Sequence, residues 1–287
     1  MSASQVGKTK APTEWREYPE PIDNQRVIRT LEQALQDLEK IGDVTIPKET
    51  HLAIREIEDA KLREERIFAV LEAAGVASLP FSTPLSLLFL LLGWRQGVRY
   101  EKVRRLVELM KELDEAFKGQ GLEMTALVEH PTNEPVDLLL RFPGKHFFLL
   151  GIRSYGDAEV VFNEKRQRFF QKKPDDKGLR SILLDPVDTL MQHVVWLQKH
   201  YRPFFGGTSR AAKRPLPRIL VIWKPSRLAQ HREELYETFG SVRVLSARYE
   251  KGGSLFAVNR EDVIMFVKEY LAFRINKERG DEKISLK

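Results

Sequence analysis

The hydrophobic periodicity of the chain changes near residue 120, and this change constrains the fold more than any other feature. Before it, apolar residues recur every three or four positions, as on one face of an α-helix. After it, short runs alternate in hydrophobicity or are fully apolar, as in β-strands. For a chain of 287 residues, this order predicts a helical N-terminal region followed by an α/β domain.

Four helices are expected before the change. They cover residues 24–41, residues 47–75, a stretch from Thr83 to about Gly93, and residues 98–118. The third contains the apolar run of residues 85–92, and its eight residues are too few for a bilayer core, which needs about 20. A buried helix is the favoured interpretation of this run, and an interfacial membrane helix or a partner-binding surface is the alternative.

The same patterns suggest domain boundaries. Residues 1–23 contain three prolines and few apolar residues, which predicts a disordered tail. We expect a helical region at 24–97, an α/β domain at 98–277 and a charged tail at 278–287. The polar N-terminus shows no signal peptide, so a cytoplasmic location is expected. Cysteine is absent, which excludes a disulfide scaffold, a thiol nucleophile and zinc sites built on thiolates.

Within residues 98–277 the expected order is helix, three strands, helix, strand, helix, strand, helix. Residues 136–142 and 146–152 are expected to pair as an antiparallel hairpin around the Pro143-Gly144 turn. Such a hairpin, followed by a crossover helix and a parallel strand, gives a mixed sheet flanked by helices. The later elements are a possible edge strand at 158–162, a helix from Asp185-Pro186 to His200, a buried strand at 219–223, a helix at 226–239, a strand at 242–245, a hairpin or loop at 251–253 and a helix at 260–276.

The charge is segregated along the chain. The total of 47 Lys and Arg against 41 Asp and Glu gives only +6. Residues 141–180 and 199–232 together carry +14, so the rest of the chain carries −8. A segregated basic surface is typical of a polyanion binder, and a surface kept basic for solubility is the alternative.

The order helix, three strands, helix, strand, with Asp137 on the second strand, resembles the core of the PD-(D/E)xK nuclease superfamily. There, the Asp and a Glu/Asp-x-Lys on the third strand hold Mg²⁺ beside a lysine that activates water. The resemblance covers about residues 120–225, is nearest to the nuclease-related (NERD) type, and implies a restriction-endonuclease-like sheet. The matching residues are Asp137, Gly144, Gly151-Ile152-Arg153-Ser154, Gly156-Asp157, Val160-Val161, Asp185-Pro186-Val187-Asp188, Thr189 in place of the usual Gln, His193 and Leu197.

The departures from this motif concern the catalytic positions. Gly151 stands where the acidic ligand belongs, and Arg153 replaces the lysine. Glycine has no side chain to hold Mg²⁺, and an arginine cannot exchange a proton as a lysine can. The resemblance therefore implies a vestigial Asp137, no cofactor and a pseudoenzyme, unless Asp157, Glu159 or Glu164 supplies a migrated acid. An ordinary ion pair between Asp137 and Arg153 is the structural alternative.

A cleft that has lost its metal can still bind a nucleic-acid backbone. Arg153 could contact phosphate, and basic residues interleaved with Phe169 and Phe170 could add contacts that do not read sequence. Core packing of the two phenylalanines and a solvated linker at 210–218 are the alternatives. The candidate nucleic-acid contacts are Arg153, Lys165, Arg166, Arg168, Lys172, Lys173, Arg210, Lys213, Arg214 and Arg218.

Three functions remain open on the sequence. The first is a catalytically inactive nuclease-like protein that binds nucleic acid, with DNA expected, or serves as a subunit of a nucleic-acid-handling complex. The second is an active Mg²⁺-dependent endodeoxyribonuclease with a rearranged site around Asp137. The third is a purely structural scaffold that binds a protein partner through residues 24–118. No transmembrane segment is expected in any of them.

Overall fold

The computed structural model describes residues 50–78, 83–130, 134–175, 178–201, 205, 216–249 and 253–285. All of these residues belong to one compact unit, residues 46–287. The predictions for the tail at 1–23, the helix at 24–41 and most of the basic loop at 210–218 lie outside the described residues.

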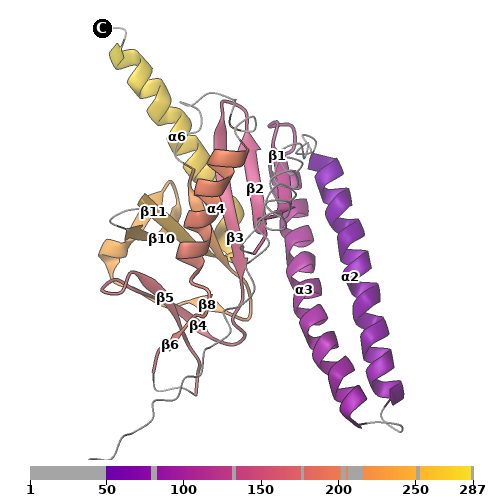
Figure 1. Ribbon diagram of the computed structural model, residues 1–287. Helices are drawn as coiled ribbons and strands as arrows, with labels where there is room; N and C mark the ends of the chain where they lie inside the picture. Colours follow the sequence, from indigo (N-terminus) through magenta and orange to yellow (C-terminus); the bar gives the residue numbers. More distant parts are fainter. Residues whose placement is uncertain are drawn as a thin grey trace, which may run out of the picture. The chain divides into compact units, whose positions relative to one another are not determined.

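Two long helices, α2 (Thr50–Ser78) and α3 (Thr83–Ala116), lie side by side as an antiparallel hairpin (Figure 1). The prediction that a helix ends near Gly93 is wrong, because α3 continues through it and through the expected domain boundary at 97/98. A second glycine of α3, Gly97, allows the helix to pack closely on α2. A Cβ at Gly97 would lie 3.1 Å from the Phe68 ring of α2, so the missing side chain makes room for that ring.

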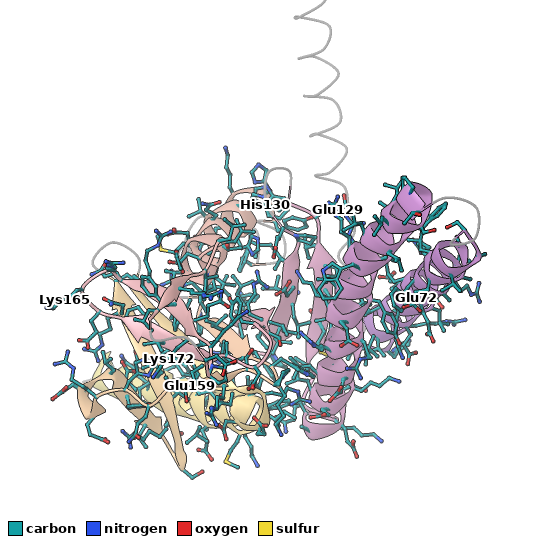
Figure 2. The ribbon with its side chains drawn as sticks, turned by 90° about the horizontal axis from the view of Figure 1, so that it is seen from below. Glu72, Glu129, His130, Glu159, Lys165 and Lys172 are labelled. Atoms are coloured by element: carbon teal, nitrogen blue, oxygen red, sulfur yellow. The ribbon has the colours of Figure 1, made fainter. Side chains whose placement is uncertain are left out.

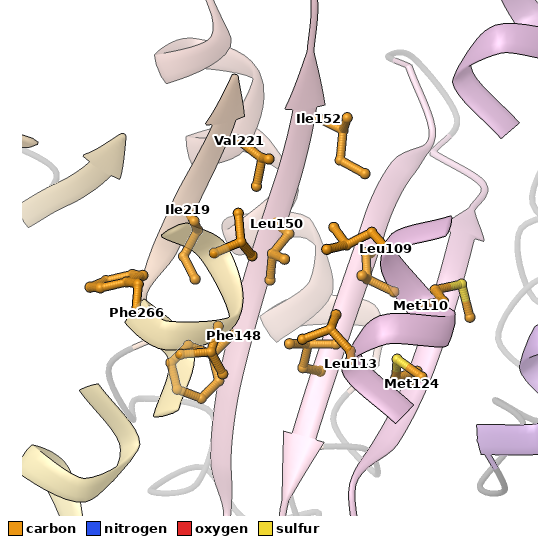
Figure 3. Close-up of a cluster of buried hydrophobic side chains, with 14 of the residues drawn as sticks. Leu109, Met110, Leu113, Met124, Phe148, Leu150, Ile152, Ile219, Val221 and Phe266 are labelled. Atoms are coloured by element: carbon orange, nitrogen blue, oxygen red, sulfur yellow. The ribbon is translucent and has the colours of Figure 1, made fainter. Parts of the chain in front are cut away.

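The C-terminal half of α3 packs on a sheet. Figure 3 shows Leu109, Met110 and Leu113 of α3 among side chains of the strands, including Phe148 and Leu150, and all five are fully or almost fully buried. This cluster is the first of two apolar cores, and it continues to Phe266 of the last helix.

The main sheet has seven strands in the order β1-β2-β3-β7-β11-β10-β9. Both pairings of β2 are antiparallel, whereas β7 pairs in parallel with β3 and with β11. The sheet is therefore mixed, and the α/β prediction is confirmed. The strands are β1 (Glu123–Val128), β2 (Val136–Phe142), β3 (His146–Arg153), β7 (Arg218–Ile222), β9 (Tyr236–Phe239), β10 (Val242–Tyr249) and β11 (Gly253–Asn259).

A second sheet of four strands has the order β6-β5-β4-β8. The predicted strand at 158–162 exists as β4, but it has a neighbour on each side rather than lying at an edge. Alternate side chains of this sheet, such as Val160 and Phe162, belong to the second apolar core, which also receives α4. The strands are β4 (Glu159–Asn163), β5 (Arg168–Lys172), β6 (Arg180–Ser181) and β8 (Arg227–Leu228).

The crossover helix α4 (Pro186–His200) begins as predicted. Asp185 is its N-cap, and the carboxylate accepts a hydrogen bond from the Val187 N–H. The last helix, α6 (Val263–Ser285), follows the 3₁₀ turn η2 (Arg260–Asp262) and confirms the final predicted helix. It continues to Ser285, so the boundary expected at residue 278 falls inside a helix.

The predicted helix at 226–239 is wrong. The segment forms β8, the 3₁₀ turn η1 (Glu233–Leu235) and β9. Tertiary pairing overrides the local pattern, because β9 completes the sheet edge beside β10. The turn between them needs Gly240, whose φ of +55° is unfavourable for other residues. β10 and β11 pair in antiparallel fashion, which agrees with the hairpin expected at 251–253, but the strand β11 in the interior of the sheet is absent from the predicted elements.

Across the residues that the structure describes, no helix has the combined length and apolarity of a membrane span.

Candidate functional site

Asp137, the aspartate on which the resemblance rests, lies near the start of β2, inside the protein. Only 2% of the surface of Asp137 is exposed. Continuing the β2–β3 register by one residue places it opposite Gly151, on the sheet face that α4 covers. The N–H of Ile152 donates a hydrogen bond of 2.7 Å to its Oδ2. Strand pairing thus places the carboxylate where the sequence predicted, but without access to solvent.

Two cations hold this carboxylate. Arg153 Nη1 lies 2.6 Å from Asp137 Oδ2, and Lys102 Nζ lies 2.7 Å from Oδ1. Glu134 contacts both cations, with its Oε2 at 3.0 Å from Arg153 Nη2 and 3.6 Å from Lys102 Nζ. We call Lys102, Glu134, Asp137 and Arg153 the ion cluster. It joins two cations to two carboxylates, so its formal charge is zero.

The pKa of Asp137 reflects this arrangement. Burial by itself would raise the pKa of the carboxyl group, because the charged form loses its water. The charges of Arg153 and Lys102, with the Ile152 N–H, outweigh that cost and hold the pKa below its ordinary value. Asp137 is therefore a fixed carboxylate, bound by cations of its own chain.

The position of the second acid is filled by another side chain. A Cβ on Gly151 would lie 3.0 Å from Leu190 Cδ2 of α4, which is closer than such contacts normally come. Leu190 is almost fully buried in the second apolar core. Glycine at 151 is thus what lets α4 pack directly on the sheet, and a glutamate there would have to displace Leu190.

These residues do not fit Mg²⁺, the ion that the resemblance implies. A hard cation needs several free oxygen ligands, but both Asp137 oxygens already face donors or cations and Gly151 supplies none. Lys102 and Arg153 would also repel it. Within the described ranges, no group of three or more His, Asp or Glu side chains is arranged to hold a metal.

Arg153 is engaged within its own chain. Its Nη1 donates to Asp137 and to the Ile152 carbonyl oxygen at 2.8 Å, and its Nη2 donates to Glu134. Three of its five N–H groups are thereby used, and its side chain is only 14% exposed. This geometry agrees with the ion-pair interpretation, so we do not retain Arg153 as a phosphate contact.

Sequence reasoning missed other members of the site. Lys102 lies in the helix predicted at 98–118 with no motif to mark it, and only the packing of α3 brings it to Asp137. Glu134 lies just before β2 and had no pattern to mark it. His193 of α4 was indicated by the resemblance alone. Its Nε2 lies 2.8 Å from the Glu134 carbonyl oxygen. Burial lowers the pKa of its imidazole.

The candidate nucleic-acid contacts separate into groups. Lys165, Arg166, Lys172 and Lys173 are exposed. Arg168 pairs with Asp185 at 2.9 Å, and Arg218 is buried and donates to the Ser254 carbonyl oxygen. Phe169 and Phe170 are buried, as the core interpretation predicted. Arg210, Lys213 and Arg214 lie outside the described residues.

The exposed cations flank β5. Lys165 and Arg166 lie in the turn before β5, and Arg166 stacks 5.6 Å above the Phe170 ring. Lys172 and Lys173 lie at the other end, where Lys172 pairs in register with Glu159 of β4. Figure 2 shows Lys172 beside Glu159 and Lys165 well away from both. We call these four cations the β5 cations.

Two of the acids considered for a migrated metal site are already paired. Glu159 lies 3.0 Å from Arg227, and Glu164 accepts a hydrogen bond of 3.1 Å from Arg232. Asp157 lies in the exposed turn before β4.

No family model matches the chain, and no curated protein or solved structure gives a match to it.

Proposed function

We propose that this chain is a catalytically inactive, nuclease-like protein that binds the backbone of nucleic acid. Apart from β4, β5 and β6, which are inserted between β3 and α4, the order α3-β1-β2-β3-α4-β7, with β3 and β7 parallel, is the one expected of the PD-(D/E)xK core. Asp137 stands on its second strand, as the resemblance requires.

The ion cluster is the observation that carries the proposal. Breaking the contacts of Lys102 and Arg153 to release Asp137 for a metal would leave two partly or largely buried cations with Glu134 as their one carboxylate partner in the cluster. The space of the second acid is taken by Leu190. Such a core keeps the nuclease architecture while its polar residues stabilise the fold instead of binding Mg²⁺.

The β5 cations support the binding part of the proposal. The strand that they flank, Arg168–Lys172, spans about 13 Å at roughly 3.3 Å per residue. That length corresponds to about four base pairs of duplex at 3.4 Å each. Cations spaced in this way contact phosphates without reading bases, so we expect little sequence preference.

A salt titration of binding tests this function. We expect the full chain to bind duplex DNA with an affinity that falls steeply as salt rises. Reversing Lys172 and Lys173 to Glu should weaken binding at least about tenfold and reduce the slope of log K against log salt by about 2. The matched control reverses Lys268 and Lys277, two exposed lysines of α6, and should change binding about twofold at most. Absence of binding to DNA or RNA, duplex or single-stranded, even at low salt, would overturn the proposal.

A cleavage assay tests the inactive part separately. Incubating the full chain and plasmid DNA with Mg²⁺ or Mn²⁺ should leave the DNA intact. Metal-dependent nicking that disappears in Asp137→Ala, while Glu261→Gln still nicks, would instead establish the active endonuclease with a rearranged site.

A further inference from the structure

The end of the α2–α3 hairpin away from β1 is apolar and exposed (Figure 1). We call residues 73–78 of α2 and 83–94 of α3 the hairpin tip. The sequence from 73 to 94 contains no charged residue. The prediction of a buried helix for residues 85–92 is wrong, because most of its large side chains face solvent. The exposed apolar residues of the tip include Val76, Leu87, Leu88, Leu90, Leu91, Leu92 and Trp94, with Leu91 at 65% and Trp94 at 75%.

The apolar surface surrounds α3 instead of forming one stripe. Ser86 and Gly93 face α2, where Ser86 Oγ lies 2.9 Å from Ser78 Oγ and Gly93 packs near Leu71. Successive residues of a helix are turned by about 100° around its axis. Viewed along the axis, the exposed apolar side chains run in the order Leu90, Trp94, Leu87, Leu91, Leu88, Leu92, and together they cover an arc of about 200°. A single docked helix covers a stripe of only about 100°. An apolar surface around most of a helix is what a lipid environment accommodates.

The length of the tip matches one leaflet. The twelve residues from Thr83 to Trp94 span about 17 Å of helix. Half of the hydrocarbon core of a bilayer is about 15 Å thick. A tip of this length reaches the middle of a bilayer and does not cross it.

Moving along the hairpin away from the tip, the first charged residues of α2 and of α3 lie at the same level. On α2 the first is Glu72, which neighbours Leu71, the residue packed near Gly93. On α3 the first is Arg95, next to Trp94. Both are exposed, as are Arg66 and Arg99 further from the tip. Tryptophan is enriched at the level of lipid headgroups, and arginine binds their phosphates.

We propose that the hairpin tip inserts into one leaflet of a lipid bilayer. Trp94 then lies at the headgroup level, with Arg66, Arg95 and Arg99 near lipid phosphates. The leucines of the tip contact acyl chains. This inference does not depend on nucleic-acid binding, because the β5 cations belong to a different part of the fold.

Vesicle flotation tests the proposal. The full chain is mixed with phosphatidylcholine vesicles, with and without phosphatidylglycerol, and floated on a density gradient. We expect the chain to float with the vesicles, and more of it when phosphatidylglycerol is present, because the arginines attract anionic headgroups. Leu91→Glu should reduce partitioning at least about tenfold, because a carboxylate is expensive in acyl chains.

The control is Leu183→Glu, the same substitution at a leucine that is 96% exposed and lies outside the hairpin. It should float like the unmodified chain. Circular dichroism of both variants verifies the fold, and Leu87→Glu provides a second site in the tip. Failure to float with either vesicle, or flotation of Leu91→Glu equal to that of the control, overturns the proposal. A dimer in solution that dissociates in Leu91→Glu, without vesicle binding, would assign the tip to a second copy of the chain and also overturn it.

Discussion

The two halves of α3 have similar side chains and opposite environments. Leu106 and Leu109 in the C-terminal half are 1% and 0% exposed, because the sheet covers them. Leu88 and Leu91, five turns earlier along the same helix, are exposed. The helical period is continuous through both halves, so periodicity determines that the residues are helical but not what covers them. The burial of a residue of α3 therefore depends on whether the sheet lies against it. The sheet covers only the C-terminal half of the helix.

Charged residues show the same contrast. The Asp137–Arg153 pair is buried and reinforced by Lys102, whereas the Lys224–Glu261 pair is largely exposed. Removing one partner from a buried pair leaves an uncompensated charge, while an exposed pair contributes little because water replaces the partner.

The largest expected effect separates these two pairs. Asp137→Asn should lower the free energy of unfolding by about 3–5 kcal/mol, because Arg153 and Lys102 lose their buried counter-charge and keep only the more exposed Glu134. Glu261→Gln should lower it by at most about 1 kcal/mol. Urea denaturation followed by circular dichroism measures both values. Equal effects would contradict the buried geometry of the ion cluster.

The next prediction compares the two halves of α3. Leu109→Ala should destabilise the chain by about 2–5 kcal/mol, because it opens a cavity in the first apolar core. Leu91→Ala, at an exposed position, should change the stability by about 0.5 kcal/mol or less in the absence of lipid. Denaturant midpoints of the two variants provide the comparison. A large loss in Leu91→Ala would show that the tip is covered in solution.

A smaller effect is expected where α4 meets the sheet. Gly151→Ala should cost about 1–3 kcal/mol through its close approach to Leu190. In a Leu190→Ala background the same substitution should cost less, because the space is open. A double-mutant cycle measured by thermal unfolding gives the coupling between the two positions. If the stability losses of the two substitutions are additive, the contact with Leu190 does not explain the glycine at position 151.

The smallest effect is a dependence on pH. The folded pKa of Asp137 lies below its ordinary value of 3.8, so its contribution to stability is fully present well above that pH. It is lost as pH falls through the folded pKa, because the carboxylate then takes up a proton. The stability difference between the unmodified chain and Asp137→Asn should therefore shrink as pH is lowered below about 4, as denaturation curves across that range would reveal. A difference that stays constant would assign the acid sensitivity to other groups.

The elements that the sequence predicted well are those with a local signal. The Pro143-Gly144 turn and the Asp185-Pro186 cap identified β2, β3 and α4, and full hydrophobicity identified β7. The elements that it missed depend on distant partners. β9 is a strand because β10 lies beside it, and α3 continues through Gly93 as it packs along α2, where Gly93 lies near Leu71.

The site was predictable only in part for the same reason. Asp137, Gly151 and Arg153 follow from strand order and register. Lys102 precedes Asp137 by 35 residues on a helix that could have faced either way, and Leu190 reaches Gly151 from another element. Side chains that meet through packing of separate elements leave no spacing signal in the chain.

The length of α3 has a mechanical consequence. Its 34 residues make a rod of about 51 Å, whereas the eight residues of β3 span about 26 Å. About half of the rod therefore projects beyond its support, whatever side chains it carries. Lys102 is bound to Asp137 close to the point where the support ends, two turns from Trp94. A force applied to the hairpin tip would therefore act on the Lys102–Asp137 ion pair and on the apolar contacts of α3 that begin at Val103.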